Sequence, residues 1–484
     1  MKQPSLVVAL LLSVFAVACS KSSSPDLSSG VVARDGDLSV PPKANCGPGS
    51  KPETGVQGRV SREDHTSGRA KEGFTCNTEV VGSYTVPDAI GTVGGFKVER
   101  YTDAAGHDCA YYDSTLLFPT NLIDNQGGVK VLDMSDPTNP KLTASLITPA
   151  MLSPHESLVL SKQRGVLAAV LGNPAFGPGV VDVYDISQDC RTPIFKSSTP
   201  LGVFGHESGM SPDGKTFYSA SPTTSTLVAL DISNLSLPVP VAFANIGSHG
   251  LSLSADGNRA YVASISGLNA APFNGVIILD TSDIQSRKTA AQFREVSRVT
   301  WDSISIPQNA IPITIKGHPY LVEIDEYTDA INPASIGSGT GKIGAGRIID
   351  IGDEKNPKVI SNMRLEVQQP EYKAARDGDP GAQVPVQGYG GHYCNVPTRV
   401  DPTIVACSMI ISGLRVFDIR DPYHPKEIAY FNPPENPRIT PVFEASNWAM
   451  SSPSFVPERK EIWYSDGYSG FYAVRLTNGA WPTN

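Results

Sequence analysis

The sequence predicts an all-β protein, a seven-bladed β-propeller of four-stranded antiparallel blades, with six blades as the alternative. The chain has 44 Gly and 40 Pro in 484 residues, which favours many short strands joined by turns. An apolar run that ends in Asp, usually followed by a Pro-bearing turn, recurs along the chain. The intervals between the shared Asp residues are 52, 46, 49, 70 and 68, and the shorter ones match the length of one blade. The shared residues are Asp133, Asp185, Asp231, Asp280, Asp350 and Asp418.

Each repeat is predicted to be a meander of four strands, A to D, in which the apolar run before the Asp is strand C. Strand B precedes it, as in 216–221, 259–264 and 461–466. Strand D follows the turn, as in 141–147 and 426–431. The repeated Asp is expected to cap the C–D turn by accepting backbone N–H groups, which is a structural role.

The last repeat ends after its third strand, and a seventh, weaker copy at 470–478 carries Arg475 where the others have Asp. The missing fourth strand is predicted at 78–87, directly before a first A strand at 96–106. This pairing would close the ring and leave no open sheet edge between the first and last blades.

The repeats over residues 78–478 resemble the LVIVD-repeat family, a bacterial propeller group found in exported proteins. The resemblance implies the propeller fold and export. It implies no particular activity, because the family has none that is settled.

The N-terminal residues predict an export signal. A positive start at Lys2 precedes an apolar run at 5–18, which is too short to cross a bilayer. The sequence 16–19 resembles a bacterial lipobox, although Ala16 stands where Leu is preferred. The resemblance implies lipidation of Cys19, and Ser20 resembles the outer-membrane sorting class of Gram-negative bacteria. An ordinary secretory signal is the alternative.

Four segments are therefore predicted. They are a signal peptide (1–18), a lipidated Cys with a flexible tether (19–30), an irregular N-terminal segment (31–77) and a propeller domain (78–484).

The net charge limits the classes of partner that the protein can bind, and the cysteine content indicates its cellular compartment. The net charge of −9 and the absence of a basic cluster argue against nucleic acid. Six of the seven Cys remain after Cys19, an even number that is typical of an oxidising compartment. Six Cys allow fifteen pairings. The predicted strands favour Cys394–Cys407 across one hairpin and Cys109–Cys190 between adjacent blades, which leaves Cys46–Cys76.

One face of the ring is predicted to carry function. In a meander, B–C and D–A connections share a face, here called the loop face. It would receive both long insertions, 328–346 and 367–390. His155, His206, His249 and His392 each stand at the predicted start of an A strand, the innermost strand, with Asp302 and Ser452 at that place in blades 5 and 7.

Two interpretations of these histidines remain open. Converging imidazoles could bind copper or zinc, with Glu156 and Glu207 as outer acceptors or acid–base groups. Alternatively, the repeated His is structural, bonding backbone or channel water. Glu323, Asp325 and Glu326 could bind calcium, but their spacing matches no EF-hand loop.

Three functions follow in order of preference. The first is a cell-envelope module that binds a small ligand, a glycan or a partner protein at the loop face. The second is a metal-dependent enzyme, and the third is a lactonase-type hydrolase.

Overall fold

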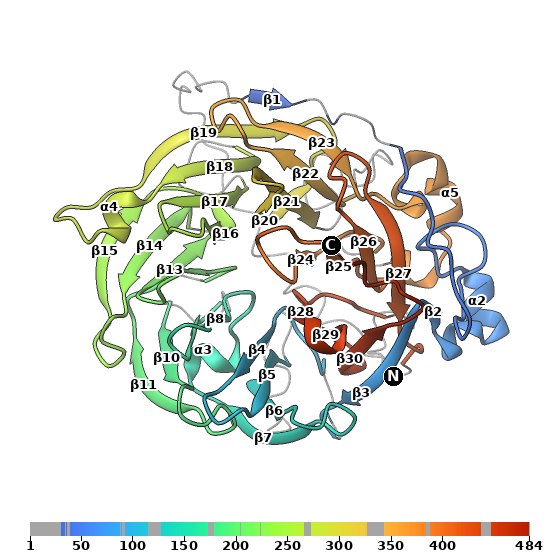
Figure 1. Ribbon diagram of the computed structural model, residues 1–484, viewed down its shortest axis with the longest axis horizontal. Helices are drawn as coiled ribbons and strands as arrows, with labels where there is room; N and C mark the ends of the chain where they lie inside the picture. The colour runs from blue at the N-terminus through green and yellow to red at the C-terminus, as the bar shows by residue number, and fades with distance from the viewer. Residues whose placement is uncertain are drawn as a thin grey trace, which may run out of the picture. The chain divides into compact units, whose positions relative to one another are not determined.

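Seven antiparallel sheets stand around a common centre, so the predicted seven-bladed β-propeller is confirmed and the six-bladed alternative is wrong (Figure 1). The computed structural model describes residues 31–33, 35, 39–87, 89, 92–114, 127–172, 179–203, 205–222, 224–265, 273–326, 343–383, 388–436 and 447–483. The predicted signal peptide, Cys19 and the tether lie outside these residues, as does most of the insertion at 328–346.

Each blade is an A–B–C–D meander. Blades 1 and 2 contain β4 (Val98–Thr102), β5 (Asp108–Asp113), β6 (Val129–Asp133), β7 (Lys141–Leu146), β8 (Val159–Ser161), β9 (Val166–Val170), β10 (Val181–Asp185) and β11 (Ile194–Thr199). Blades 3 and 4 contain β12 (Gly209–Met210), β13 (Thr216–Ser221), β14 (Thr226–Asp231), β15 (Val239–Ala244), β16 (Ser248–Leu253), β17 (Arg259–Ser264), β18 (Gly275–Asp280) and β19 (Arg294–Trp301).

The remaining blades follow the same order. They contain β20 (Ile306–Ile315), β21 (His318–Glu326), β22 (Gly346–Asp350), β23 (Lys358–Asn362), β24 (Tyr393–Asn395), β25 (Ile404–Ser408), β26 (Leu414–Asp418), β27 (Lys426–Asn432), β28 (Ser454–Val456), β29 (Glu461–Asp466), β30 (Gly470–Leu476) and β3 (Thr78–Tyr84). The short helices are α2 (Arg62–Ser67), η1 (Arg69–Glu72), α3 (Pro149–Leu152), α4 (Ser282–Gln285), η4 (Glu366–Gln368), η5 (Pro370–Tyr372), α5 (Lys373–Arg376), η6 (Pro380–Gln383) and η7 (Pro457–Arg459).

The ring closes as predicted. β3 pairs antiparallel with β30, from Thr78 opposite Leu476 to Tyr84 opposite Phe471. Because β3 comes from the start of the propeller and β30 from its end, this pairing joins the two ends of the ring. Blades 7 and 1 then share an apolar cluster that includes Trp463 and Tyr112.

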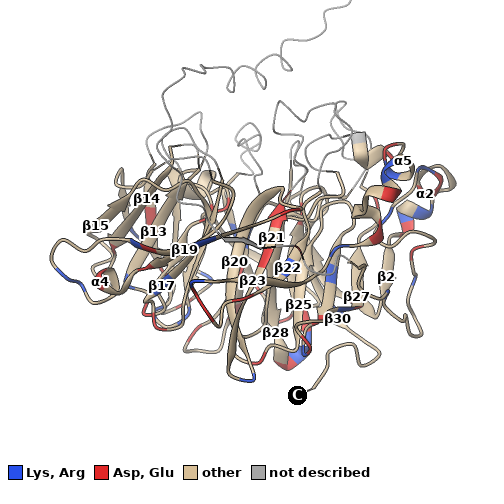
Figure 2. Cartoon of the chain, turned by 90° about the horizontal axis from the view of Figure 1, so that it is seen from above, with Lys and Arg blue, Asp and Glu red and all other residues tan. Residues whose placement is uncertain are grey.

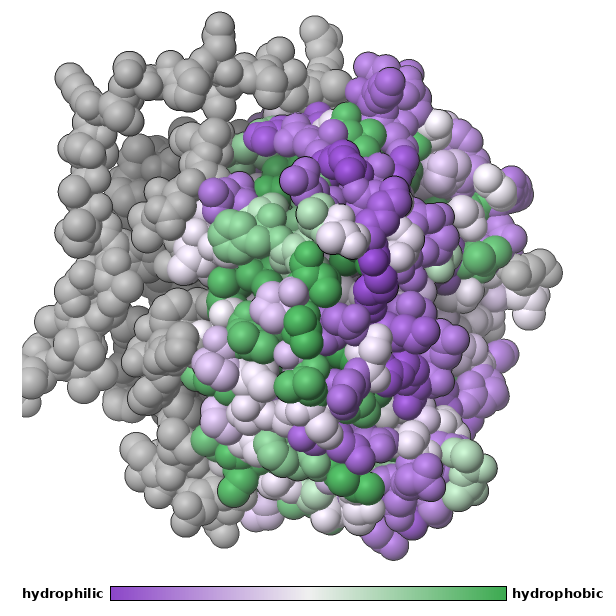
Figure 3. Space-filling model, turned by 90° about the vertical axis from the view of Figure 1, so that its left-hand side faces the viewer, coloured by the Kyte–Doolittle hydropathy of each residue, from purple (hydrophilic) through white to green (hydrophobic). Residues whose placement is uncertain are grey.

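The core lies between neighbouring blades. C strands are almost fully buried, whereas D strands form the outer rim and expose apolar side chains. Figure 3 shows apolar surface along the middle of one side of the molecule and polar surface along its edge. The most exposed apolar residues on β11 and β15 are Ile194, Phe195, Val239 and Phe243.

All six repeated Asp residues cap their C–D turns, as predicted. Each accepts a hydrogen bond from the backbone N–H two residues later, as Asp133 does from Ser135 at 2.9 Å. The equivalent bonds run to Asp185, Asp231, Asp280, Asp350 and Asp418. This local bond fixes the tight turn between strands C and D.

The N-terminal segment is more ordered than its irregular composition suggests. β1 (Val31–Ala33) adds a parallel fifth strand to blade 4, and β2 (Phe74–Cys76) adds an antiparallel one to blade 6. Between them, Ser61 caps the N-terminus of α2 in a capping box closed by Asp64. The segment therefore covers two sheet edges that would otherwise be open.

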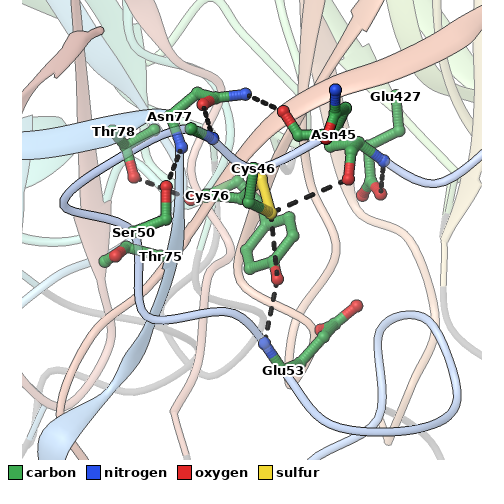
Figure 4. Close-up of a disulfide and its surroundings, with 12 residues drawn as sticks. Asn45, Cys46, Ser50, Glu53, Thr75, Cys76, Asn77, Thr78 and Glu427 are labelled. Atoms are coloured by element: carbon green, nitrogen blue, oxygen red, sulfur yellow. Dashed lines mark hydrogen bonds between the residues drawn. A yellow bond between two sulfur atoms is a disulfide. The ribbon is translucent and has the colours of Figure 1, made fainter. Parts of the chain in front are cut away.

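The three predicted disulfides are all present. Cys394 and Cys407 face each other across β24 and β25, and Cys109–Cys190 joins blades 1 and 2. Cys46–Cys76 fastens the N-terminal segment, where Asn77 bonds both Ser50 and Asn45 (Figure 4). Disulfides of this number are typical of proteins outside the cytoplasm. Within the described residues, no helix has the length and apolar character of a membrane span.

The insertion between β23 and β24 lies, in its described part, at the outer rim beside α2 (Figures 1 and 2). Arg59 of the N-terminal segment forms a bidentate ion pair with the buried Asp379. Tyr389 also donates to Asp379 at 2.9 Å. The long connection is thus fastened to the N-terminal segment at the rim, away from the centre of the ring.

Candidate metal centre

The four histidines singled out by the repeats meet near the ring axis. His155, His206 and His392 lie just before the A strands of blades 2, 3 and 6, and His249 lies within β16 of blade 4. His155 Nε2 and His206 Nε2 are 3.0 Å apart, and the ring centroids of His206 and His249 are 4.3 Å apart. Phe96 of blade 1 packs against both His155 and His392, at 4.8 Å and 5.2 Å between centroids.

Irregular backbone turns these side chains inward. His249 is the extra residue of a β-bulge, because Ser248 pairs with Ser264 and Gly250 already pairs with Ala263. Gln308 is the extra residue of a second bulge on the inner strand of blade 5. Bulges re-aim side chains and are frequent beside active sites.

His155 is held in the left-handed region, with φ of 49°, which is uncommon for a residue other than Gly. Strained backbone of this kind clusters at functional sites. Gly172 packs against it, since a Cβ at position 172 would lie 2.3 Å from the His155 Cβ.

Two buried carboxylates complete the cluster. Glu156 Oε2 lies 2.5 Å from His206 Nδ1, and its Oε1 lies 3.3 Å from His392 Nε2. Glu326, the last residue of β21, places Oε1 3.0 Å from His249 Nε2 and Oε2 3.1 Å from His392 Nε2. Because β20 and β21 are antiparallel, the end of strand B reaches the same face as the start of strand A.

His249 and His392 share one hydrogen-bonding pattern. Each Nδ1 lies 2.6 Å from a backbone carbonyl, that of Pro307 for His249 and that of Met450 for His392. A carbonyl only accepts, so Nδ1–H is the donor, and each Nε2 then faces the carboxylate of Glu326. Such contacts between a nitrogen and a carboxylate require a cation on Nε2, either a proton or a metal ion.

The electrostatics divide the histidines into two pairs. Burial opposes the charge, yet Glu326 raises the pKa of His249 to about 9. Burial likewise opposes the charge on His392, while Glu156 and Glu326 raise its pKa to about 9. In contrast, burial and the neighbouring His206 lower the pKa of His155 to about 3, and burial lowers the pKa of His206.

The carboxylates are held as anions. Burial opposes ionisation of Glu156, but His206 keeps the pKa of Glu156 well below its ordinary value. Glu326 behaves similarly, because His249 outweighs burial and lowers the pKa of Glu326. The metal-free cluster therefore pairs two imidazolium groups with two carboxylates.

A second polar group lies beside the cluster. Lys97 Nζ donates to Glu207 Oε1 at 2.6 Å, and both side chains are buried. Gln308 donates to Glu156 Oε2 at 2.6 Å and to the Tyr393 hydroxyl at 2.7 Å. The carboxylate of Glu207, predicted at the channel mouth, thus accepts from Lys97, while the backbone N–H of Glu207 donates to the carbonyl of His249 at 3.1 Å.

The remaining sequence candidates lie apart from the imidazoles. Asp302 is exposed and takes no part in the contacts above. Blade 5 instead contributes Gln308 and Glu326, because β20 begins only at Ile306. Ser452 is buried in blade 7 and pairs with Lys97 through a parallel backbone bridge.

Sequence reasoning missed Gln308, Lys97 and Tyr393, and considered Glu326 only for calcium. Glu326 could have been found from its position at the end of strand B, because strand B of an antiparallel meander ends on the loop face. Glu323 and Asp325, the other two acidic residues of that strand, bond Arg347 in a separate buried network.

The donor set suits a transition metal. His155, Glu156 and His206 have ligand atoms within 4.8 Å of one another, and so do Glu156, Glu326 and His392. Imidazole suits zinc, copper, iron and nickel, and carboxylate oxygens broaden that range. A third group, Asp103, His107 and Asp189, lies between blades 1 and 2 and is less buried.

Comparison with known proteins supports the fold. No protein-family model and no curated protein matches the sequence. Among solved structures, the chain is similar to hydrazine synthase of Kuenenia stuttgartiensis, with a TM-score of 0.50 and 13% identity over 83% of this chain and 99% of that chain. A periplasmic gluconolactonase of Pseudomonas aeruginosa is 14% identical, with a TM-score of 0.45 over 74% of this chain and 94% of that chain. At 13% identity, the likeness to hydrazine synthase shows the fold alone.

Proposed function

We propose that this protein is an exported β-propeller that binds a transition-metal ion, copper or zinc, in the cluster at its ring axis. The observation that carries the proposal is the pattern shared by His249 and His392. Both imidazoles give Nδ1–H to a backbone carbonyl and aim Nε2 at Glu326. This is the orientation in which ligating histidines are held by their outer bonds.

The bound ion would replace two protons. With His249 and His392 neutral, both Nε2 lone pairs face the Glu326 carboxylate, at 3.0 and 3.1 Å from its two oxygens. The ion would supply Lewis acidity or redox chemistry, and the chain would supply orientation and a site largely screened from water. For this reason we favour a metal-dependent enzyme over a simple ligand-binding module.

Metal analysis of protein purified without a histidine tag tests the proposal. We expect about one copper or zinc ion per chain, lost in His249→Ala. His424→Ala is the matched control, because that side chain is 77% exposed and should leave the metal content unchanged.

A wild-type protein with intact fold and no metal after incubation with either ion would contradict the proposal. It would favour the module that binds a small ligand, a glycan or a partner protein at the loop face.

We further propose that the chain belongs with the LVIVD-repeat propellers and is anchored to the outer membrane through lipidated Cys19. The six Asx-capped repeats and the lipobox-like sequence support these two points. Cys19→Ala should release the protein from the membrane fraction, whereas retention there would contradict the anchor.

A further inference from the structure

The axial cluster contains more donor groups than one metal ion needs. Four imidazoles and two carboxylates gather there, whereas a tetrahedral zinc site uses four ligands in all. Among the described residues, the converging ligand atoms form two sets, each within 4.8 Å of one another. The carboxylate set is Glu156, Glu326 and His392, and the histidine set is His155, Glu156 and His206. The cluster therefore has donors for two neighbouring ions.

Glu156 belongs to both sets. Its Oε1 lies 3.3 Å from His392 Nε2, and its Oε2 lies 2.5 Å from His206 Nδ1. The two oxygens of one carboxylate thus face different sets. Gln308 donates to Oε2 at 2.6 Å and fixes the orientation of this carboxylate. In two-metal sites the ions lie about 3.5–4 Å apart, a distance that a single carboxylate can span with its two oxygens.

The nitrogen atoms of the histidine set are placed for a shared ligand. His155 Nε2 and His206 Nε2 face each other at 3.0 Å. Two nitrogens bound to one ion, each at about 2.0–2.1 Å, lie about 3 Å apart, so this separation suits a common ion.

Buried polar atoms in both sets point to the same conclusion. Among the described residues, His155 Nδ1 and His206 Nδ1 are buried without a hydrogen bond, because the contact of His206 with Glu156 lacks hydrogen-bond geometry. Glu326 Oε2 in the carboxylate set is in the same condition. Buried polar atoms almost always have a partner, and several exceptions in one cluster indicate that ligands belong there.

Charge and exposure determine the order in which the two sets would fill. The carboxylate set brings two negative charges to one dication, whereas the histidine set brings two imidazoles and only shares Glu156. At such a short distance the first dication also repels the second. His392 is 0% exposed and His206 is 18% exposed, so the histidine set lies nearer to solvent. Protein loaded with one equivalent of metal would therefore hold its ion in the carboxylate set.

We propose that the axial cluster is a dinuclear metal centre, an inference that rests on the proposed metal binding. The carboxylate set holds the first ion, with His249 orienting Glu326. The histidine set holds a second ion, which shares Glu156 with the first. Imidazole ligands suit copper or zinc, whereas magnesium and calcium prefer oxygen, so the second ion is copper or zinc.

Titration of the apoprotein with Zn²⁺ alone counts the ions. Equilibrium dialysis should give about two zinc ions per chain, the second bound about tenfold or more weakly than the first because the dications repel each other. His155→Asn and His206→Ala should lose the second ion and keep the first. Asn is chosen at position 155 because it tolerates the left-handed backbone there. Glu326→Gln should weaken the first ion by about a hundredfold.

His107→Ala is the matched control. It removes the ligand set that His107 forms with Asp103 and Asp189 between blades 1 and 2, and it leaves the axial cluster intact. Both zinc ions should remain in this variant. Circular dichroism of every variant checks that a lost ion does not reflect a lost fold.

Copper gives a readout that depends on the distance between the ions. Two Cu²⁺ ions that share a carboxylate couple magnetically. The electron paramagnetic resonance signal per copper should therefore be smaller at two copper ions per chain than at one. His206→Ala should bind one copper ion and give the signal of an isolated Cu²⁺ at every copper concentration.

The outcomes separate the two proposals. No zinc in the wild-type protein would overturn both the proposed function and the dinuclear centre. A single zinc ion at saturation would preserve the proposed function and overturn the second site. A second ion that disappears in His107→Ala, or two copper signals that simply add, would show an adventitious ion only and would also overturn the second site. Loss of both ions in folded His206→Ala would show one site with common ligands and contradict the division into two sets.

Discussion

At the scale of single residues, the inner strands depend on glycines that leave room for functional side chains. A Cβ at Gly250 would lie 2.0 Å from Glu207 Oε2 and 2.2 Å from the backbone oxygen of Gln308. Both neighbours belong to the buried network beside the cluster, and one of them is main chain that cannot move alone. Gly250 therefore connects local packing to the site.

Gly250→Ala is expected to destabilise the protein by about 1–3 kcal/mol, because overpacking displaces Glu207 or the bulge at Gln308. Urea unfolding measures the change. Gly378→Ala is the control, since a Cβ there meets nothing within 4 Å and should change stability by less than about 0.5 kcal/mol. Equal effects of the two substitutions would show that the close contact at position 250 is not real.

The residues of the site were only partly predictable. The four histidines occupy one repeat position, so a correct strand assignment was enough to bring them together. Gln308 is turned inward by a bulge, and a bulge leaves no mark in the spacing of apolar residues. Asp302 was assigned by counting along blade 5, where β20 starts later than the other inner strands.

At the scale of elements, local chemistry made the strands predictable. The ranges 216–221, 259–264 and 461–466 coincide with β13, β17 and β29. Each is a β-branched or aromatic run bounded by turn residues, and in the first two cases an Asx-capped turn, at Asp231 and at Asp280, follows the next strand. The three-residue strands β1 and β2 carry no such signal, because their structure comes from pairing with distant edges.

Loss of the inter-blade disulfide is expected to cost more than loss of the disulfide within blade 6. Cys109–Cys190 closes 81 residues and Cys394–Cys407 closes 13. The chain-entropy relation gives roughly 4.5 and 3 kcal/mol. Paired Cys→Ser variants, compared by urea unfolding, measure the difference, and a larger cost for the blade 6 variant would contradict the loop-length account.

At the scale of the whole molecule, ring closure places the site. His155 and His392 come from blades 2 and 6, 237 positions apart in the sequence (392 − 155), and Phe96 of blade 1 touches both. The arrangement therefore depends on β3 holding blade 7 against blade 1.

Deletion of residues 78–84 should abolish cooperative unfolding, because β30 would lose its partner and the ring would open. Deletion of residues 31–33 is the control. It removes the added strand from blade 4 but leaves the ring closed. Circular dichroism during thermal unfolding follows both variants, and a cooperative transition in the first would show that closure does not need β3.

The most direct test of the account is a crystal structure of the metal-loaded protein, with anomalous diffraction recorded at the absorption edge of the bound metal. The account predicts one strong anomalous peak within the axial cluster, at coordination distance from its histidine nitrogens and from the carboxylate of Glu156 or Glu326. A cluster without a peak, in protein that carries the metal elsewhere, would contradict it.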